Sequence, residues 1–187
     1  QVTPRPELTG DYQFYNQDRV VHRSQGWAFD IAMHSTRIAN YESFSGENLK
    51  GWYTGDGMTY LYTNPSDYAF NFWPTVEPHR LPGSTADRDI SRTKSSSDYR
   101  STTPWAGGVS SGGMYGSAGM DFKQHNSTST PKADLSAKKS WFMFDDEIVS
   151  LGAGITSTSG RTVETVADNR LLNSQGDNQL TVNGAVK

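Results

Sequence analysis

Large apolar residues recur at alternate positions in several short segments of this chain, the pattern of strands that bury one face. Residues 27–33 alternate in this way, and residues 162–166 are rich in β-branched side chains. Residues 138–151 predict a β-hairpin whose turn lies at Asp145-Asp146, and residues 179–182 predict a further strand. Clear helical periodicity is missing. The pattern therefore predicts an all-β fold, with large antiparallel sheets packed as a sandwich.

Both ends of the chain are expected to continue into other structure. Residues 1–17 begin with two closely spaced prolines, which predict an extended linker, and the sandwich is assigned to residues 18–187. Asn183-Gly184 predicts a type I′ hairpin turn, but only three residues follow it. A hairpin without its second arm is a poor end for a domain, so we expect the natural chain to continue beyond Lys187.

A long surface excursion is expected between the predicted strands. Residues 84–113 are rich in Ser, Thr, Gly and Arg, and two Gly-Gly pairs interrupt their second half. Connections of this length within a compact domain are usually functional or mobile.

Composition narrows the class of protein. The 187 residues carry a formal net charge of −3, so the basic excess of a nucleic-acid-binding protein is absent from the sequence. Five Trp, nine Tyr and eight Phe supply the apolar area for a core. No apolar run approaches the roughly 20 residues that span a bilayer, so we expect no membrane partner. The absence of cysteine excludes disulfides and thiolate metal sites.

The segment 34–57 holds the best candidates for ligand contact, because it mixes an arginine, amides, aromatics and glycines between two predicted strands. The guanidinium fork of Arg37 matches a carboxylate or sulfate, although from these residues alone a solvated surface arginine, or a salt bridge to a local acid such as Glu42, is the favoured interpretation. Asn40 and Asn48 could donate to sugar hydroxyls or bond their own turns. Tyr41 could act on a substrate or simply pack.

Other polar groups suggest weaker sites. Glu164 shares a half-buried strand face with apolar residues and therefore needs a partner, which an arginine from another strand would supply. The acidic run 145–147 is best interpreted as a hairpin tip rather than a calcium loop, because its carboxylates are consecutive. The four histidines lack ligand spacing. We expect no metal and no cofactor.

Nearly the whole chain resembles the central β-sandwich of the polysaccharide lyase family 8 enzymes, which are bacterial hyaluronate, chondroitin and xanthan lyases. The motifs that carry the likeness, in order, are Thr3–Gly10, Asp18–Arg23, Asn40–Glu42, Gly46–Tyr53, Gly55–Gly57, Trp73–Val76, Leu81–Gly83, Ala137–Asp146, Leu151–Gly154 and Val163–Thr165. The resemblance implies a super-sandwich domain within a larger enzyme that also has an N-terminal α/α-toroid and a C-terminal β domain.

What the resemblance implies about activity is β-elimination on a polysaccharide that contains uronic acid. The family's catalytic Asn, His and Tyr lie in the toroid, which is not in this chain, so the isolated chain is expected to be inactive. Arg37 matches a family arginine that contacts substrate, and Glu164, or less well Glu147, matches a glutamate that orients it. Tyr41 stands near the place of a second arginine in chondroitin lyases, which leaves the polymer preference open.

Two hypotheses follow. In the first, the chain is part of a secreted, extracellular polysaccharide lyase and supplies the wall of the substrate cleft through Arg37, Asn40, Tyr41 and Asn48. In the second, it is an inactive saccharide-binding or structural β-sandwich.

Overall fold

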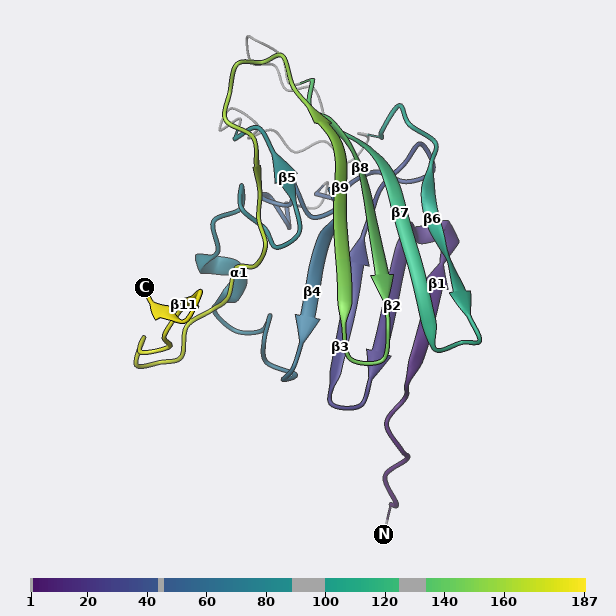
Figure 1. Cartoon of the computed structure of the whole chain (residues 1–187), viewed down its shortest axis with the longest axis vertical. Helices are drawn as coiled ribbons and strands as arrows, with labels where there is room; N and C mark the ends of the chain where they lie inside the picture. The colour runs from purple at the N-terminus through teal and green to yellow at the C-terminus, as the bar shows by residue number, and fades with distance from the viewer. Residues whose placement is uncertain (1, 44–45, 89–99, 125–133) are drawn as a thin grey trace.

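The computed structural model describes residues 2–43, 46–88, 100–124 and 134–187, and most of its regular structure is β. Two four-stranded antiparallel sheets face each other, as Figure 1 shows. The elements in chain order are β1 (Gly10–Phe14), the 3-10 turn η1 (Tyr15–Gln17), β2 (Arg19–Ser24), β3 (Trp27–Ala32), β4 (Met58–Tyr62), α1 (Phe72–Thr75), β5 (Thr85–Ala86), β6 (Ala106–Ser111), β7 (Tyr115–Lys123), β8 (Ser136–Met143), β9 (Ile148–Thr156), β10 (Glu164–Thr165), β11 (Thr181–Val182) and β12 (Ala185–Val186).

Both large sheets are meanders, in which each strand pairs with the next one along the chain. The first sheet has the order β1-β2-β3-β4 and the second β6-β7-β8-β9. The predicted strand at 27–33 is β3, and the predicted hairpin at 138–151 is β8 and β9 with residues 144–147 between them. The prediction of an all-β antiparallel sandwich is therefore confirmed.

The main core lies between the two sheets, because alternate side chains of each strand point inward. The inward residues of the first sheet include Val20, Phe29 and Ile31. Facing them, the second sheet contributes Met120 and Trp141 among others. Burial of large side chains at about 25 cal/mol per Å² makes this layer the principal source of stability.

A second apolar cluster lies beneath the connections at one end of the first sheet. It contains Ala32, Tyr41, Trp52, Tyr53, Met58, Leu81 and Ala86, all buried. The described parts of the connection from β3 to β4, residues 33–43 and 46–57, thus contribute Tyr41, Trp52 and Tyr53 to a packed cluster rather than forming only a loose rim.

The excursion expected at 84–113 differs from the structure. Residues 84–87 are buried and include β5, which pairs with β10, while 106–111 form strand β6 of the second sheet. The glycines that suggested a loop instead allow close approach: a Cβ at Gly108 would lie 2.2 Å from the carbonyl oxygen of Ser117 on β7. Residues 89–99 lie outside the described part of the chain.

The two ends also differ in detail from the expectation. β1 lies within the segment 1–17 that was assigned to a linker, and it pairs with β2, so the sheet begins at Gly10 rather than at residue 18. At the other end, β11 and β12 form a two-stranded hairpin, so the expectation that its second arm is missing is wrong. Asn183 and Gly184 have φ of 51° and 77°, as the predicted type I′ turn requires.

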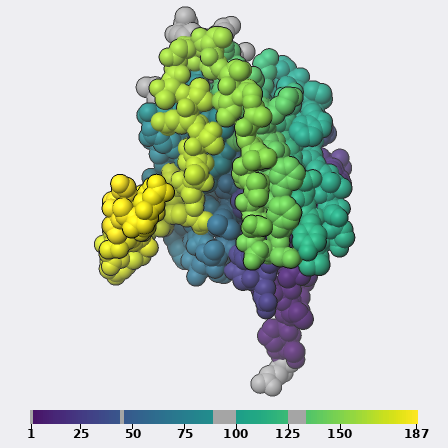
Figure 2. Space-filling model, viewed as in Figure 1, coloured from purple at the N-terminus to yellow at the C-terminus, as the bar shows by residue number. Residues whose placement is uncertain are grey.

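The terminal segments project from the sandwich, as the space-filling view shows (Figure 2). Residues 2–8, which precede β1, extend away from the body, and the β11–β12 hairpin stands out at its side. Among the described residues, no helix has the length and apolar character needed to cross a membrane.

Candidate functional site

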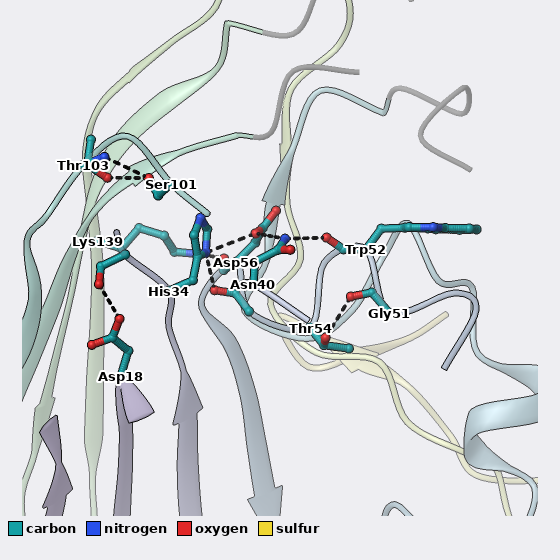
Figure 3. Close-up of polar contacts among 12 residues, drawn as sticks. Asp18, His34, Asn40, Gly51, Trp52, Thr54, Asp56, Ser101, Thr103 and Lys139 are labelled. Atoms are coloured by element: carbon teal, nitrogen blue, oxygen red, sulfur yellow. Dashed lines mark hydrogen bonds and ion pairs between the residues drawn. The ribbon is translucent and has the colours of Figure 1, made fainter. Parts of the chain in front are cut away.

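The connection between β3 and β4 is held in shape by a buried polar network, part of which is drawn in Figure 3. Nδ1 of His34 lies 2.7 Å from the carbonyl oxygen of Gly55 and 3.4 Å from Oδ1 of Asp56. The amide of Asn40 donates to the carbonyl oxygen of Trp52 (3.0 Å) and to Oδ1 of Asp56 (3.1 Å). These bonds join His34 and Asn40 to residues 52–56, so the beginning of the connection is held against its end.

Lys139 joins this connection to the opposite sheet. It lies on β8, is only 6% exposed, and donates through Nζ to the carbonyl oxygens of Gly83 and, at 3.4 Å, of Asp56. Its ammonium also lies 5.7 Å from the ring centre of Trp141 and 5.9 Å from that of Phe122. Burial lowers the pKa of Lys139 to about 8, against the opposing effect of the Asp56 carboxylate.

Arg37 projects from the same connection and is anchored by a buried carboxylate. Its Nε donates to Oδ1 of Asp18 at 3.0 Å, and Nη2 donates both to the same oxygen and to the carbonyl oxygen of Ala106. Nη1 donates to the carbonyl oxygen of Pro104 at 3.1 Å. The Arg37 side chain is 40% exposed, whereas that of Asp18 is fully buried. The guanidinium therefore lies at the surface with its orientation fixed from below.

This geometry limits what Arg37 can offer a ligand. Four of the five N–H groups of a guanidinium are used within the fold, so one N–H of Nη1 and the exposed edge of the group remain. The partner is Asp18, not the local acid Glu42 that the sequence suggested. Asp18 is itself held by Ser35, whose hydroxyl donates to Oδ2 at 2.6 Å.

Glu164 does not orient Arg37, so that expected pairing is wrong. Glu164 lies on β10, which pairs with β5, and its carboxylate accepts from Nε of Arg80 at 3.0 Å and Nη1 of Arg88 at 3.3 Å. The hydrogen bond from Arg80 is the main reason that the pKa of Glu164 is lowered. The expectation of an arginine partner from outside its own strand is confirmed, because β10 pairs with β5 and Arg80 and Arg88 lie on either side of β5. The alternative, Glu147, lies in the β8–β9 turn, where its carbonyl oxygen accepts from Phe144.

The three remaining candidates separate into interior and surface residues. Asn40 and Tyr41 are 3% and 8% exposed, so in this chain they are structural parts of the connection and do not present a face to a polymer. Asn48 is exposed, has φ of 50°, and donates to the carbonyl oxygen of Glu42 at 3.1 Å. It also lines a surface cavity, which leaves it as a candidate for ligand contact.

The sequence did not lead to Asp18 or Lys139 as candidates, although the strand pattern around Lys139 indicates that its side chain points inward. Lys139 occupies the inward phase of β8, between Ala137 and Trp141, and a charged residue in that phase must find polar partners. Asp18 carries no such pattern, because its role depends on Ser35 and Arg37, which lie 17 and 19 positions away.

Metal binding has no support from the described residues, since no group of three or more His, Cys, Asp or Glu side chains there is arranged to hold an ion. The acidic run 145–147 forms the turn between β8 and β9, as predicted.

Comparisons with known proteins agree with this architecture. Residues 9–187 match the model of the polysaccharide lyase family 8 super-sandwich domain. A xanthan lyase from Bacillus sp. (strain GL1) is 50% identical over 174 residues, which are 92% of this chain and 18% of that protein. A hyaluronate lyase from Thermasporomyces composti is 40% identical over 186 residues, which are 98% of this chain and 23% of that protein.

Solved structures show the same relationship. The structure of Paenibacillus xanthan lyase matches with a TM-score of 0.88 and 49% identity, over 100% of this chain and 17% of that one. A Streptomyces coelicolor A3 chondroitin AC lyase in complex with chondroitin sulphate matches with a TM-score of 0.84 and 38% identity, over 98% of this chain and 24% of that one. The chain thus spans about a fifth of the length of these relatives. It belongs to polysaccharide lyase family 8, of which it contains the super-sandwich domain.

Proposed function

We propose that this chain is part of a secreted bacterial lyase that cleaves a polysaccharide containing uronic acid, of the hyaluronan, chondroitin or xanthan type, by β-elimination. The chain contributes a rigid wall of the substrate cleft, and an N-terminal α/α-toroid supplies the proton-transferring residues. Family membership over residues 9–187 is the observation that carries the proposal.

The reaction explains why a cationic wall is useful. A base removes the proton at C5 of the uronate, the bond between C4 and the bridging oxygen breaks, and the leaving oxygen takes up a proton as the C4–C5 double bond forms. Negative charge grows on the uronate carboxyl group during proton removal, so fixed N–H donors near that group lower the barrier. This chemistry requires no metal or organic cofactor.

Arg37 is the residue through which we expect the chain to act. Its side chain is 40% exposed, and Asp18, Pro104 and Ala106 hold it in one orientation. A donor that is already oriented loses little entropy when it meets substrate. Asp18, rather than Glu164, is the positioning residue in this proposal.

The test must distinguish the loss of the Arg37 guanidinium as a donor from the loss of stability that follows when the buried Asp18 carboxylate has no partner. Arg37→Ala leaves the buried Asp18 carboxylate unpaired, which by itself is strongly destabilising. We therefore pair it with the double variant Asp18→Asn/Arg37→Ala in the full-length protein, with Arg23→Ala on β2 as a matched surface control. Cleavage is followed by the ultraviolet absorbance of the unsaturated uronate product.

We expect both Arg37 variants to lose turnover by on the order of 10²–10³-fold, the size of one lost transition-state donor. The double variant should recover most of the lost stability but none of the lost turnover, and Arg23→Ala should retain both. Recovery of turnover together with stability would show that Arg37 is only a structural ion-pair partner, which is what the second hypothesis of a structural or saccharide-binding sandwich requires. The isolated chain should show no turnover on hyaluronan, chondroitin or xanthan.

A further inference from the structure

Two neighbouring cavities beside α1, together called the groove here, are lined by residues that the proposed function does not use. Their volumes are about 550 Å³ and about 410 Å³, and Lys50 and Pro78 line both of them. Asn48 and Trp73 line the larger cavity, and Arg80 and Arg88 line the smaller one. The combined volume is suited to a ligand much larger than a single ion.

Exposed and buried aromatic rings line the groove. Trp73, on α1, is 45% exposed although it is one of the largest apolar side chains. Trp52 lies deeper and stacks on His79, with ring centres 4.9 Å apart and planes 28° from parallel. A tryptophan ring presents a broad apolar face together with an N–H, which suits the mixed apolar and hydroxylated surface of a sugar ring.

Positive charge is in excess along the same groove. Lys50, Arg80 and Arg88 line it, and Lys50 has no ion-pair partner among the residues that the structure describes. Arg80 and Arg88 share the single carboxylate of Glu164. The second acid, Glu77, accepts from Nδ1 of His79 at 2.8 Å. Three permanent cations thus face two carboxylates, although the chain as a whole is acidic.

Two buried nitrogen atoms in groove-lining side chains lack partners. Nε1 of Trp52 and Nε2 of His79 have no hydrogen bond within the described part of the chain. Most buried polar groups in proteins are satisfied, so unpaired ones suggest a ligand or solvent site. This observation is independent of the charge and of the exposed tryptophan.

We propose that this groove binds an acidic sugar unit of the polysaccharide, with the ring on Trp73 and its carboxylate facing Lys50 and the two arginines. The proposal rests on the proposed function for the polymer class, and it deepens that function by adding a second contact surface to the one at Arg37. A protein segment is the competing occupant, because Phe70 beside α1 is 85% exposed. The excess of positive charge along the groove favours the acidic sugar.

The test uses the full-length protein and measures binding separately from cleavage. Affinity electrophoresis through gels containing hyaluronan, chondroitin sulfate, xanthan or neutral dextran reports binding whether or not the protein is an enzyme. The variants are Trp73→Ala, Trp73→Phe and Lys50→Gln. Lys138→Gln is the matched control, because that lysine is 78% exposed and lies on β8, away from the groove.

We expect Trp73→Ala and Lys50→Gln each to weaken binding of at least one acidic polymer by about tenfold, equivalent to roughly 1.4 kcal/mol. Trp73→Phe should recover most of the loss, Lys138→Gln should bind as the wild type does, and dextran should bind none of them. Added salt should reduce the effect of Lys50→Gln but not that of Trp73→Ala.

The outcomes separate this proposal from the proposed function. If Trp73→Ala and Lys50→Gln bind the acidic polymers as tightly as the wild type does, the groove is not a saccharide site, even if the protein cleaves polymer. If the two variants bind more weakly than the wild type, and the wild type shows no cleavage, the lyase proposal would fall while the groove would stand as a saccharide site. Unchanged binding combined with a lowered melting temperature of Trp73→Ala would show that another part of the protein covers the groove, and would overturn the sugar as its occupant.

Discussion

Replacing Lys139 by methionine should remove a pH dependence of stability that this one side chain creates. Lys139 is 6% exposed, and burial lowers its pKa from the ordinary 10.5 to about 8. Methionine has a similar length and no charge, so it keeps most of the contacts with Trp141 and Phe122 while it removes the titrating group.

The direction in which stability changes with pH depends on whether the folded or the unfolded chain binds the Lys139 proton more tightly. Between pH 8 and 10.5 the unfolded chain keeps Lys139 protonated while the folded chain releases the proton, so the free energy of unfolding rises with pH. A shift from 10.5 to about 8 corresponds to about 3 kcal/mol over the whole interval. Between about pH 7.5 and 9.5 the expected gain is about 2 kcal/mol. Burial raises the pKa of Tyr60 and Tyr68, which titrate above this window.

Urea unfolding of the chain at several pH values in this window measures the effect. The quantity of interest is the difference in unfolding free energy between the wild type and Lys139→Met as a function of pH. That difference should change by about 2 kcal/mol in favour of the wild type as the pH rises. The control Lys138→Met changes an exposed neighbour on the same strand and should show no such trend. A difference that stays constant with pH, or falls, would refute the assignment of a buried, charge-bearing Lys139.

Three further predictions concern the surroundings of the site. Asp18→Asn should loosen the orientation of Arg37 and so lower kcat of the full-length protein more than it raises KM, measured by steady-state kinetics. An unchanged kcat would show that Asp18 does not position Arg37. Gly57→Ala should destabilise the chain by about 2 kcal/mol more than Gly26→Ala, as measured by urea unfolding. Both glycines have positive φ, but only at Gly57 would the new Cβ meet other side chains, at 2.9–3.2 Å. Equal losses of stability would mean that those side chains move aside freely. The hydrogen bond from Arg80 lowers the pKa of Glu164 in the fold, so the ion pairs of Glu164 stabilise the fold above about pH 4.5 and lose that contribution on acidification. The melting temperatures of the wild type and Glu164→Gln should therefore converge as the pH falls below about 4.5. Melting-temperature curves that stay parallel would contradict this.

The alternation of apolar residues predicted some of the strands that bury one face. It identified β3 and the β8–β9 hairpin, and the Asn183-Gly184 pair identified the turn of the last hairpin. It failed for β6, where glycines that resembled a loop are used for close approach to the neighbouring strand. A period-two pattern indicates a strand through the alternation of apolar and polar side chains. A glycine-rich strand has few side chains, so its sequence shows little alternation.

Candidate residues were predicted far less well than strands. The sequence drew attention to Arg37 but could not supply its partner, since Asp18 reaches it only because β2 pairs with β3. It paired Glu164 with the wrong arginine, because the choice depends on β10 lying beside β5. Asn40 looked like a surface amide and is buried, since the connection that carries it folds onto its own end.

What the sequence determined by itself is the class of fold and the family, because local periodicity, turn chemistry and ordered motifs are properties of neighbouring positions along the chain. What the tertiary structure decided is which charges meet. The contacts of Lys139 with Gly83, of Arg37 with Asp18, and of Glu164 with Arg80 join residues 56, 19 and 84 positions apart. Such contacts follow from sheet pairing and packing, and no local pattern in the chain encodes them.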